Sequence, residues 1–482
     1  MTQLNVDCLD EIFRYFEEDK AVLHSCLLVN RYWCKVSVRI LWETPNVTAE
    51  VLNTLITCLP DEFKEFLYKD GIILRPTPCE KEVMSASTSK YPLFNYASYC
   101  QVLSISDIYS TVKHFFNNKQ SINTKEKENI NLLTQEIFKM FMGVSSIKKL
   151  SYTNDDVKIP NNINFVNFPG TKYCLRNLSE FTCTSNVNSE VFNQLSKICH
   201  NIQSLNIKFN KYSDKVSDGL KNLISSQNNL KSLSLTYYES NHWSDIIDSL
   251  SKHSNTLIKL IIKGKDNHWP LSFIKDFKNL QELEISLSYV SKEDDGYSDF
   301  EHFEDLQYFT FPHLKKLNIN LPKKVEPIVV KFLENNGENL VEFQSNYKSI
   351  NRAVSDYCPN LKSLHTTFGE KFSGLLLRNI LKKCKKLESI EPFRRGSNLS
   401  GKELLKIVAE NSPKNFHELN LHNYYEELDA EDLKSFCISL EKRNPLKLLT
   451  LIIKNGSSRK NDEKEAIINE YERKGVIKIL KM

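Results

Sequence analysis

Apolar residues recur along most of this chain in the pattern L-x-x-L-x-L, in which Ile, Phe, Tyr or Cys can replace Leu. Successive copies begin 21 to 34 residues apart. Alternation of apolar and polar residues over so short a run predicts one β-strand in each copy. Twelve copies begin at Ile147, Leu178, Ile202, Leu230, Leu257, Leu280, Leu314, Leu340, Leu361, Leu387, Phe416 and Leu446.

The segments between these strands have the apolar period of a helix. Examples are Val191-Phe192-Leu195-Ile198 and Leu433-Phe436-Leu440. A unit of one strand and one helix cannot bury its apolar face alone, so neighbouring units must stack. The fold class is therefore predicted to be α/β, a horseshoe solenoid with a parallel sheet on its concave side and helices on its convex side. Residues 476–480 are predicted as its last edge strand.

The first forty residues follow a different pattern. Leu9, Ile12, Phe13 and Phe16 recur at helical spacing, and Asn5 is placed to cap that helix. A polar break at residues 17–20 and a second apolar set predict two further short helices. Forty residues are too few to bury a large core, so we expect this helix trio to complete itself against a partner. The second apolar set comprises Val22, Leu23, Cys26 and Leu27.

This N-terminal segment resembles the F-box. The matching elements are Leu4, the helix over residues 9–16, the Leu27–Asn30 segment, Trp33 and Trp42, whereas Asn5 stands where the family usually has proline. The resemblance implies that the segment binds a Skp-family adaptor. The implied adaptor-binding residues are Leu4, Leu9, Ile12, Phe13, Leu23, Leu27, Leu28, Val29 and Trp33. An N-terminal helical cap on the following domain is the structural alternative.

The repeats resemble the leucine-rich repeats found in F-box proteins, including fungal-type members. Cys199, Cys358 and Cys384 each stand three residues before a leading apolar residue, as in the cysteine-containing class of these repeats. The resemblance implies a ribonuclease-inhibitor-like solenoid. The expected domains are an F-box over residues 1–43, a linker and N-terminal cap over residues 44–123, and the solenoid with its C-terminal cap over residues 124–482.

Composition excludes several classes of partner and site. The 64 basic and 60 acidic residues are mixed along the chain and give a net charge of +4, which favours neither nucleic acid nor a membrane surface as a partner. No signal peptide and no run of eighteen apolar residues is present, so we expect a cytoplasmic or nuclear protein. The 12 cysteines form no C-x-x-C pair and no zinc-like cluster. Reduced thiols, no metal site and no cofactor are expected.

One motif hints at enzyme chemistry. Gly396 to Lys402 matches the G-x-x-x-x-G-K of a phosphate loop, but Glu403 replaces the hydroxyl residue that such a loop needs for magnesium. Ser400 as helix N-cap with Glu403 three residues later forms a capping box, which explains the same residues structurally. We therefore expect no catalytic residue in this chain.

The predicted target-binding surface is the concave sheet. In each copy the residue between the last two apolar positions points away from the core. Most are short and polar, which suits recognition of a protein through many weak contacts. They are Ser151, Thr182, Asn206, Ser234, Ile261, Glu284, Asn318, Gln344, His365, Glu391, Asn420 and Thr450. Basic residues near the tenth and eleventh copies form either a solvated helix face or a site for an acidic segment. The candidate target-binding residues are Arg394, Arg395, Lys402, His365 and Asn420.

An F-box followed by leucine-rich repeats implies the substrate-recognition subunit of an SCF-type ubiquitin ligase. The adaptor would join the chain to a cullin, while the repeats hold a protein target whose identity the sequence does not specify. Such a subunit acts by raising the concentration of its target near a conjugating enzyme and needs no active site of its own. The alternative is a protein-interaction scaffold that acts without ubiquitin.

Overall fold

The structure is a computed structural model of the 482-residue chain. It describes residues 4–69, 92–116, 124–153, 159–160, 163–209, 216–237, 242–264, 271–287, 301–347, 349–369, 372–393, 399–421, 424–442, 447–453 and 462–481. The chain divides into two compact units. The first comprises Met1–Leu230 with Asp248–Leu250, and the second comprises Lys231–Ile247 with Ser251–Met482.

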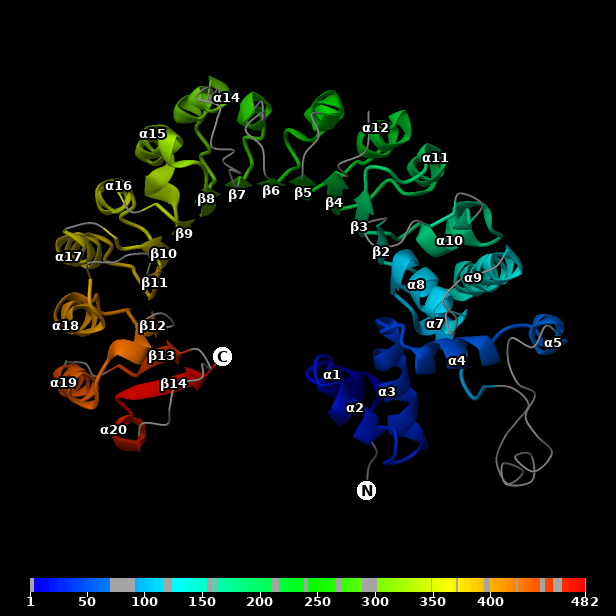
Figure 1. Cartoon of the computed structure of the whole chain (residues 1–482), viewed down its shortest axis with the longest axis horizontal. Helices are drawn as coiled ribbons and strands as arrows, with labels where there is room; N and C mark the ends of the chain where they lie inside the picture. Colours follow the sequence, from blue (N-terminus) through cyan, green and yellow to red (C-terminus); the bar gives the residue numbers. More distant parts are fainter. Residues whose placement is uncertain are drawn as a thin grey trace. The chain divides into compact units, whose positions relative to one another are not determined.

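The first unit begins with a run of helices from α1 to α7 and changes to alternating strands and helices from β1 onward (Figure 1). Its helices are α1 (Val6–Arg14), α2 (Lys20–Cys26), α3 (Arg31–Glu43), α4 (Ala49–Thr57), α5 (Asp61–Lys69), α7 (Tyr96–Tyr99), α8 (Ile105–Phe116), α9 (Thr124–Val144), η1 (Phe165–Asn167), α10 (Thr171–Leu175), α11 (Ser189–Ile198) and α12 (Asp218–Ser225). Its strands are β1 (Val102–Ser104), β2 (Lys149–Tyr152), β3 (Glu180–Thr184) and β4 (Ser204–Phe209).

The second unit continues the alternation to the end of the chain. Its strands are β5 (Ser232–Tyr237), β6 (Lys259–Gly264), β7 (Glu282–Leu287), β8 (Lys316–Asn320), β9 (Glu342–Ser345), β10 (Ser363–Thr367), β11 (Ser389–Phe393), β12 (Glu418–Asn420), β13 (Leu449–Ile453) and β14 (Ile477–Lys481). Its α-helices are α14 (Glu301–Glu304), α15 (Glu326–Asn336), α16 (Asn351–Tyr357), α17 (Ser373–Lys383), α18 (Gly401–Asn411), α19 (Ala430–Glu441) and α20 (Asp462–Arg473). Helix α13 (Ile247–Leu250) is divided, with Ile247 in the second unit and Asp248–Leu250 in the first. Its 3₁₀ turns are η2 (His242–Ile246), η3 (Ser251–His253), η4 (Leu271–Asp276), η5 (Asp305–Tyr308), η6 (Lys323–Val325), η7 (Gly337–Asn339) and η8 (Tyr425–Glu427).

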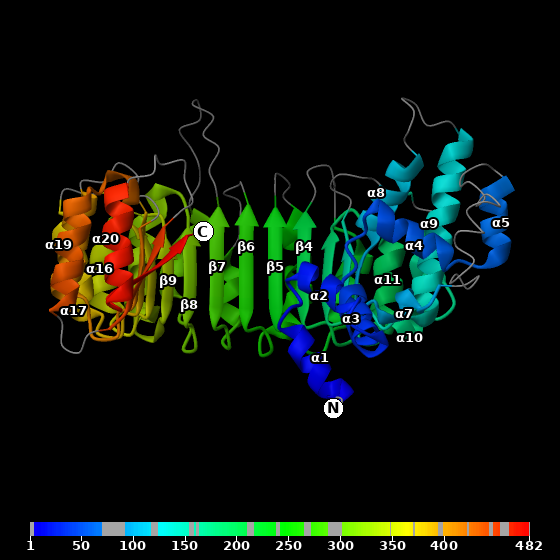
Figure 2. The ribbon, with the colours of Figure 1, turned by 90° about the horizontal axis from the view of Figure 1, so that it is seen from below.

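All strands are parallel, and within each unit they follow chain order in the sheet. In the second unit the strands line the inner side of the arc and the helices lie outside it (Figure 1), and the arrows of β6, β7 and β8 point the same way (Figure 2). One buried residue per strand occupies the same register position. In β6 to β10 that column is Leu260, Leu283, Leu317, Phe343 and Leu364. The predicted α/β repeat architecture with a parallel sheet is therefore confirmed.

The twelve predicted copies coincide with β2 to β13, and the predicted last edge strand is β14. One strand was missed, because the sheet begins at β1, which pairs with β2, inside the segment expected to be a linker. Cys100, Leu103 and Ile105 are buried and form a further copy, C-x-x-L-x-I. That segment also contains α4, α5, α7 and α8, and so is more regular than predicted.

The register of the predicted surface row also needs one correction. Thr450 pairs with Glu418, and Asn420 pairs with Ile452, which is buried. The predicted row of outward-facing residues passes from Asn420 on β12 to Ile452 on β13. It does not include Thr450. β11 also extends through Pro392 to Phe393, so the proline does not end the strand.

Buried polar side chains close the helix end of several repeats. The Cys199 thiol donates to the Leu175 carbonyl and the Cys384 thiol to the Cys358 carbonyl, each at 3.3 Å. In another repeat the buried amide of Gln227 donates to the carbonyls of Cys199 and Leu223 and accepts from the Ile202 amide. Except for the bond to Leu223, which lies in the same repeat as Gln227, each contact joins one repeat to its neighbour through a backbone group that would otherwise be buried without a partner.

Burial makes several of these thiols unreactive. It raises the pKa of Cys199 to about 12 and of Cys384 to about 11, well above the value of an exposed thiol. Because the thiolate is the reactive form, we expect iodoacetamide at pH 8 to modify exposed Cys8 before Cys199 and Cys384, which should stay intact until denaturant is added. Mass spectrometry of differentially alkylated peptides measures this order. Rapid modification of Cys384 in the native chain would contradict the packing.

Candidate protein-interaction surfaces

Helices α1, α2 and α3 share a small core. Leu9 and Phe13 of α1, Leu23 of α2 and Ile40 of α3 are buried together. The Phe13 and Trp33 rings meet edge to face with centroids 5.1 Å apart, a geometry that favours aromatic pairs. The core is therefore closed by the three helices themselves.

Two side-chain caps fix where the second and third helices begin. The Asp19 carboxylate accepts from the Val22 amide at 3.1 Å, and the Asn30 side chain accepts from the amides of Tyr32 and Trp33 at 2.9 Å each. Asn5 lies at the N-cap position of α1, but its side chain makes no capping hydrogen bond, so the predicted cap is not formed. The start of α1 is held instead by the Tyr32 hydroxyl, which donates to the Leu4 carbonyl at 2.9 Å.

A charged network links α1 to the end of α3. The Arg14 guanidinium donates to both oxygens of Glu43, at 3.2 and 3.0 Å, and to Asp10 at 3.0 Å, and Arg39 also pairs with Asp10. Burial raises the pKa of Asp10, whereas the hydrogen bonds and the charges of Arg39 and Arg14 lower it. Together the two arginines outweigh burial, so the pKa of Asp10 lies below its ordinary value. The carboxylate is therefore charged at neutral pH and helps to hold α1 against α3.

The structure places the predicted adaptor-binding residues in two environments. Leu9, Phe13 and Leu23 are core residues, and Leu27 and Trp33 are half-buried. The remaining four side chains reach solvent: Leu4 is 53% exposed, Ile12 43%, Leu28 88% and Val29 55%. In this conformation the three core residues can support a binding surface from beneath. The four exposed residues can contact a partner directly.

Three of the exposed residues belong to one end of the helix group. Leu28 and Val29 immediately precede Asn30, the N-cap of α3, and the Leu4 carbonyl is tied to Tyr32 in the first turn of the same helix. We call Leu4, Leu28 and Val29 the N-terminal apolar patch. Because the core beneath it is already complete, nothing among the described residues of α1 to α3 requires these side chains for folding.

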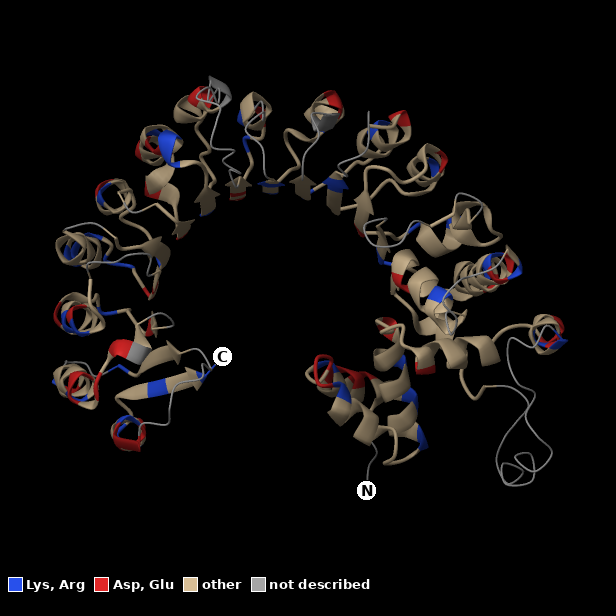
Figure 3. Cartoon of the chain, in the orientation of Figure 1, with Lys and Arg blue, Asp and Glu red and all other residues tan. Residues whose placement is uncertain are grey.

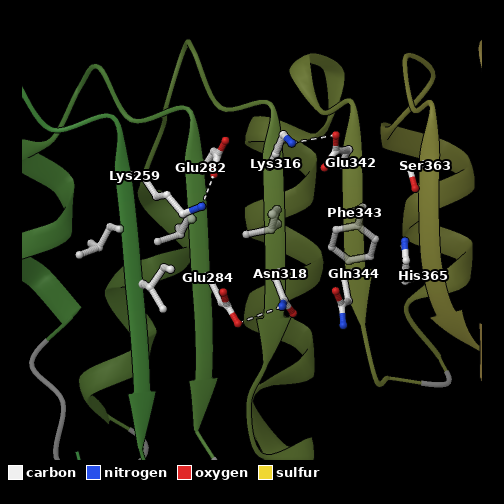
Figure 4. Close-up of a pocket in the computed structure, with 14 residues that line it drawn as sticks. Lys259, Glu282, Glu284, Lys316, Asn318, Glu342, Phe343, Gln344, Ser363 and His365 are labelled. Carbon is white, nitrogen blue, oxygen red and sulfur yellow. Dashed lines mark hydrogen bonds and ion pairs between the residues drawn. The ribbon is translucent and has the colours of Figure 1, made fainter. Parts of the chain in front are cut away.

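A second surface lies on the strands of the second unit, where a shallow hollow crosses β6 to β10 (Figure 4). Lys259 pairs with Glu282 at 2.8 Å and Lys316 with Glu342 at 3.0 Å, both across neighbouring strands. We call this feature the central hollow. Its polar lining residues are Lys259, Glu282, Glu284, Lys316, Asn318, Glu342, Gln344, Ser363 and His365.

Glu284 collects hydrogen bonds from two directions. Lys263 donates to its Oε1 at 3.0 Å, and the Asn318 amide donates to the same oxygen at 3.2 Å. Asn320 then donates to the Asn318 side-chain oxygen at 3.1 Å. Hydrogen bonds of this kind orient the amides of Asn318 and Asn320, so the surface is polar and internally paired.

The candidate target-binding residues are only partly brought together. His365 Nδ1 lies 2.7 Å from Glu391, and His365 lines the central hollow, whereas Asn420 lies two strands further along on β12. Lys402 lies on helix α18, where it pairs with Asp432 of α19 at 2.8 Å. Arg394 and Arg395 lie outside the described residues. Figure 3 shows basic and acidic residues interspersed on the helices of the second unit, consistent with the balanced composition.

The residues of the apparent phosphate loop that the structure describes have structural roles. The Ser400 hydroxyl accepts from the Glu403 amide at 3.2 Å and caps α18, as predicted. A Cβ at Gly401 would lie 2.9 Å from a methyl group of Leu428, so this glycine permits close packing of the next repeat. Within the described ranges, no group of three or more His, Cys, Asp or Glu residues could hold a metal ion, and no helix is long and apolar enough to cross a membrane.

The chain is similar to solved structures of other proteins at low sequence identity. No protein-family model matches the chain, and no curated protein matches it. Among solved structures, the chain is similar to one in the complex of Rad7 and Elc1 in yeast, at 13% identity and a TM-score of 0.39, over 78% of this chain and 93% of that one. It is also similar to one in the complex of TLR13 with ssRNA13, at 12% identity and a TM-score of 0.31, over 79% of this chain and 59% of that one.

Proposed function

We propose that this chain is the substrate-recognition subunit of an SCF-type ubiquitin ligase. In this proposal α1 to α3 are an F-box that binds a Skp-family adaptor, and the adaptor joins the chain to a cullin in the cytoplasm or the nucleus. The repeats hold a protein target, and the chain itself catalyses no reaction.

The observation that carries the proposal is the N-terminal apolar patch. Leu28 is 88% exposed and Val29 55% exposed, although the helices on either side of them, α2 and α3, already share a closed core with α1. Large apolar side chains that gather at one end of a small helix group are typical of a protein-binding surface. The same residues are among those implied as adaptor contacts by the resemblance to the F-box.

The balanced surface of the repeats supports the second half of the proposal. Lys259–Glu282 and Lys316–Glu342 alternate in sign across four consecutive strands. Such a surface lacks the excess of positive charge that nucleic acid binding requires. A parallel sheet that presents polar side chains in register suits a protein ligand, which forms many weak contacts with it.

Reconstitution tests the proposal. The full-length chain is co-expressed with a Skp-family adaptor and a cullin, and the mixture is separated by size-exclusion chromatography. A stoichiometric complex of all three is expected. Binding of the adaptor without the cullin would favour the alternative, a scaffold that acts without ubiquitin. Failure to bind either protein would refute the assignment of α1 to α3.

A further inference from the structure

The charged side chains that line the central hollow are all paired with one another or with neighbouring residues. They are already engaged within the chain: Lys259 with Glu282, Lys316 with Glu342, and Glu284 with Lys263. The His365 ring is also engaged, with its Nδ1 against Glu391. A ligand charge buried here would have to compete with a partner that is already in place. Formal charge is therefore a poor basis for recognition at this site.

The neutral polar residues of the hollow are also engaged, with one exception. The Asn318 amide donates to Glu284, and the Ser363 hydroxyl is bonded to that of Ser389 at 2.9 Å. Among the polar residues that line the hollow, the Gln344 carboxamide alone has no hydrogen-bond partner in the described part of the chain. Gln344 lies on β9, in register with Asn318 on one side and His365 on the other (Figure 4).

A free carboxamide in this place has a specific consequence for binding. Once a partner covers the hollow, Gln344 loses water and must receive both an acceptor for its N–H₂ group and a donor for its oxygen. A peptide group in an extended chain presents a carbonyl and an N–H that match this pair. In a helix or a sheet interior those two groups are already used.

We propose that the central hollow binds an extended segment of the target protein through its main chain, with the Gln344 carboxamide bonded to the carbonyl and the N–H of the segment. This inference rests on the proposed function, since it names the kind of target segment that the repeats would hold. The charges beside Gln344 are paired and of both signs, so they favour neither an acidic nor a basic ligand. The segment is selected mainly by being extended and unpaired.

The test uses a twelve-residue peptide selected from a random displayed library for binding to the full-length chain. Gln344→Met keeps the length of the side chain and removes both hydrogen-bonding ends. We expect it to weaken peptide binding by about tenfold, as for loss of a paired hydrogen bond. Methylation of one backbone nitrogen of the peptide should weaken binding to the unsubstituted chain by a similar factor and should have no further effect on the Gln344→Met variant.

Ser234→Ala on β5 is the matched control, because Ser234 occupies the same row of the sheet but does not line the hollow. It should bind the peptide as the unsubstituted chain does, and both variants should keep the same melting temperature. The inference is overturned if no selected peptide depends on Gln344. It is also overturned if binding is lost in Lys316→Ala, falls steeply with salt and is unchanged in Gln344→Met, which would identify a charged ligand.

Adaptor capture, measured on the same preparations, separates this inference from the proposed function. A chain that binds the adaptor but shows no Gln344-dependent peptide binding refutes the inference alone. A chain that binds the peptide through Gln344 but captures no adaptor supports the inference as a property of the repeats and refutes the ligase assignment.

Discussion

A full-length chain carrying Leu28→Asp and Val29→Asp is expected to lose capture of a Skp-family adaptor by about a hundredfold or more. Both side chains are more than half exposed, so the substitutions cost the free chain little stability. In an interface each would remove an apolar anchor and bury a carboxylate, and a well-buried anchor contributes about 2 kcal/mol. Two such losses correspond to roughly a thousandfold if they add, and to less if they overlap.

Surface plasmon resonance with immobilised adaptor measures this loss. Two further variants serve as controls, one for surface substitution and one for unfolding of the helices. Leu375→Asp changes a leucine of α17 that is 58% exposed, and it should leave capture unchanged. Phe13→Ala empties part of the α1–α3 core and should cost about 3–5 kcal/mol, so that capture fails together with helical content. Normal capture by the Leu28→Asp, Val29→Asp variant would mean that the adaptor does not bind at the N-terminal apolar patch.

In the N-terminal helices the spacing of apolar residues predicted the helix face correctly but did not predict which residues of that face are buried. Period alone identified Leu9, Ile12 and Phe13 as one apolar helix face, but it could not separate buried from exposed members. The orientation of α1 against α3 decides which residues are buried. It places Phe13 against Trp33 and leaves Ile12 partly in solvent. That orientation is set by long-range contacts such as Arg14–Glu43, which no local pattern encodes.

The repeats were easier to predict than the N-terminal helices, because every copy must bury apolar residues at the same positions of its strand. The missed strand β1 follows a segment rich in proline, and its leading position is Cys100 where most other copies have leucine or isoleucine. At β13, residues 446–453 fit the pattern in two frames, two residues apart. Pairing of Thr450 with Glu418 selects one frame, and only the neighbouring strand supplies that information.

The candidate site required the structure for a different reason. Sequence alternation predicted which strand residues face away from the core, including Gln344 and His365. It could not show which of them are paired, since the partners lie one repeat away, as Glu391 does from His365. For the same reason Lys402, predicted as a target contact, is held by Asp432 of the next helix.

Packing in the first unit also determines how function can be dissected. Trp42 of α3 lies against Tyr96 of α7, with ring centroids 4.6 Å apart, and the Gln101 amide donates to the Glu43 carbonyl at 2.9 Å. Removal of residues 1–43 would uncover Tyr96 and leave the Gln101 amide without its partner. Exposed substitutions in the N-terminal apolar patch disconnect the adaptor without disturbing these contacts.

In cells, the Leu28→Asp, Val29→Asp chain is therefore expected to act as a trap. It keeps the repeats intact, so it should still bind the target, but it can no longer bring that target to the adaptor and cullin. Expression of the unsubstituted chain should shorten the half-life of the bound target through polyubiquitination, whereas the variant should lengthen it several-fold. Pulse-chase labelling with and without proteasome inhibitor measures both effects. If the two chains bind the same target and neither changes its half-life or ubiquitination with adaptor and cullin present, the chain acts on that target as a scaffold and not as a ligase subunit.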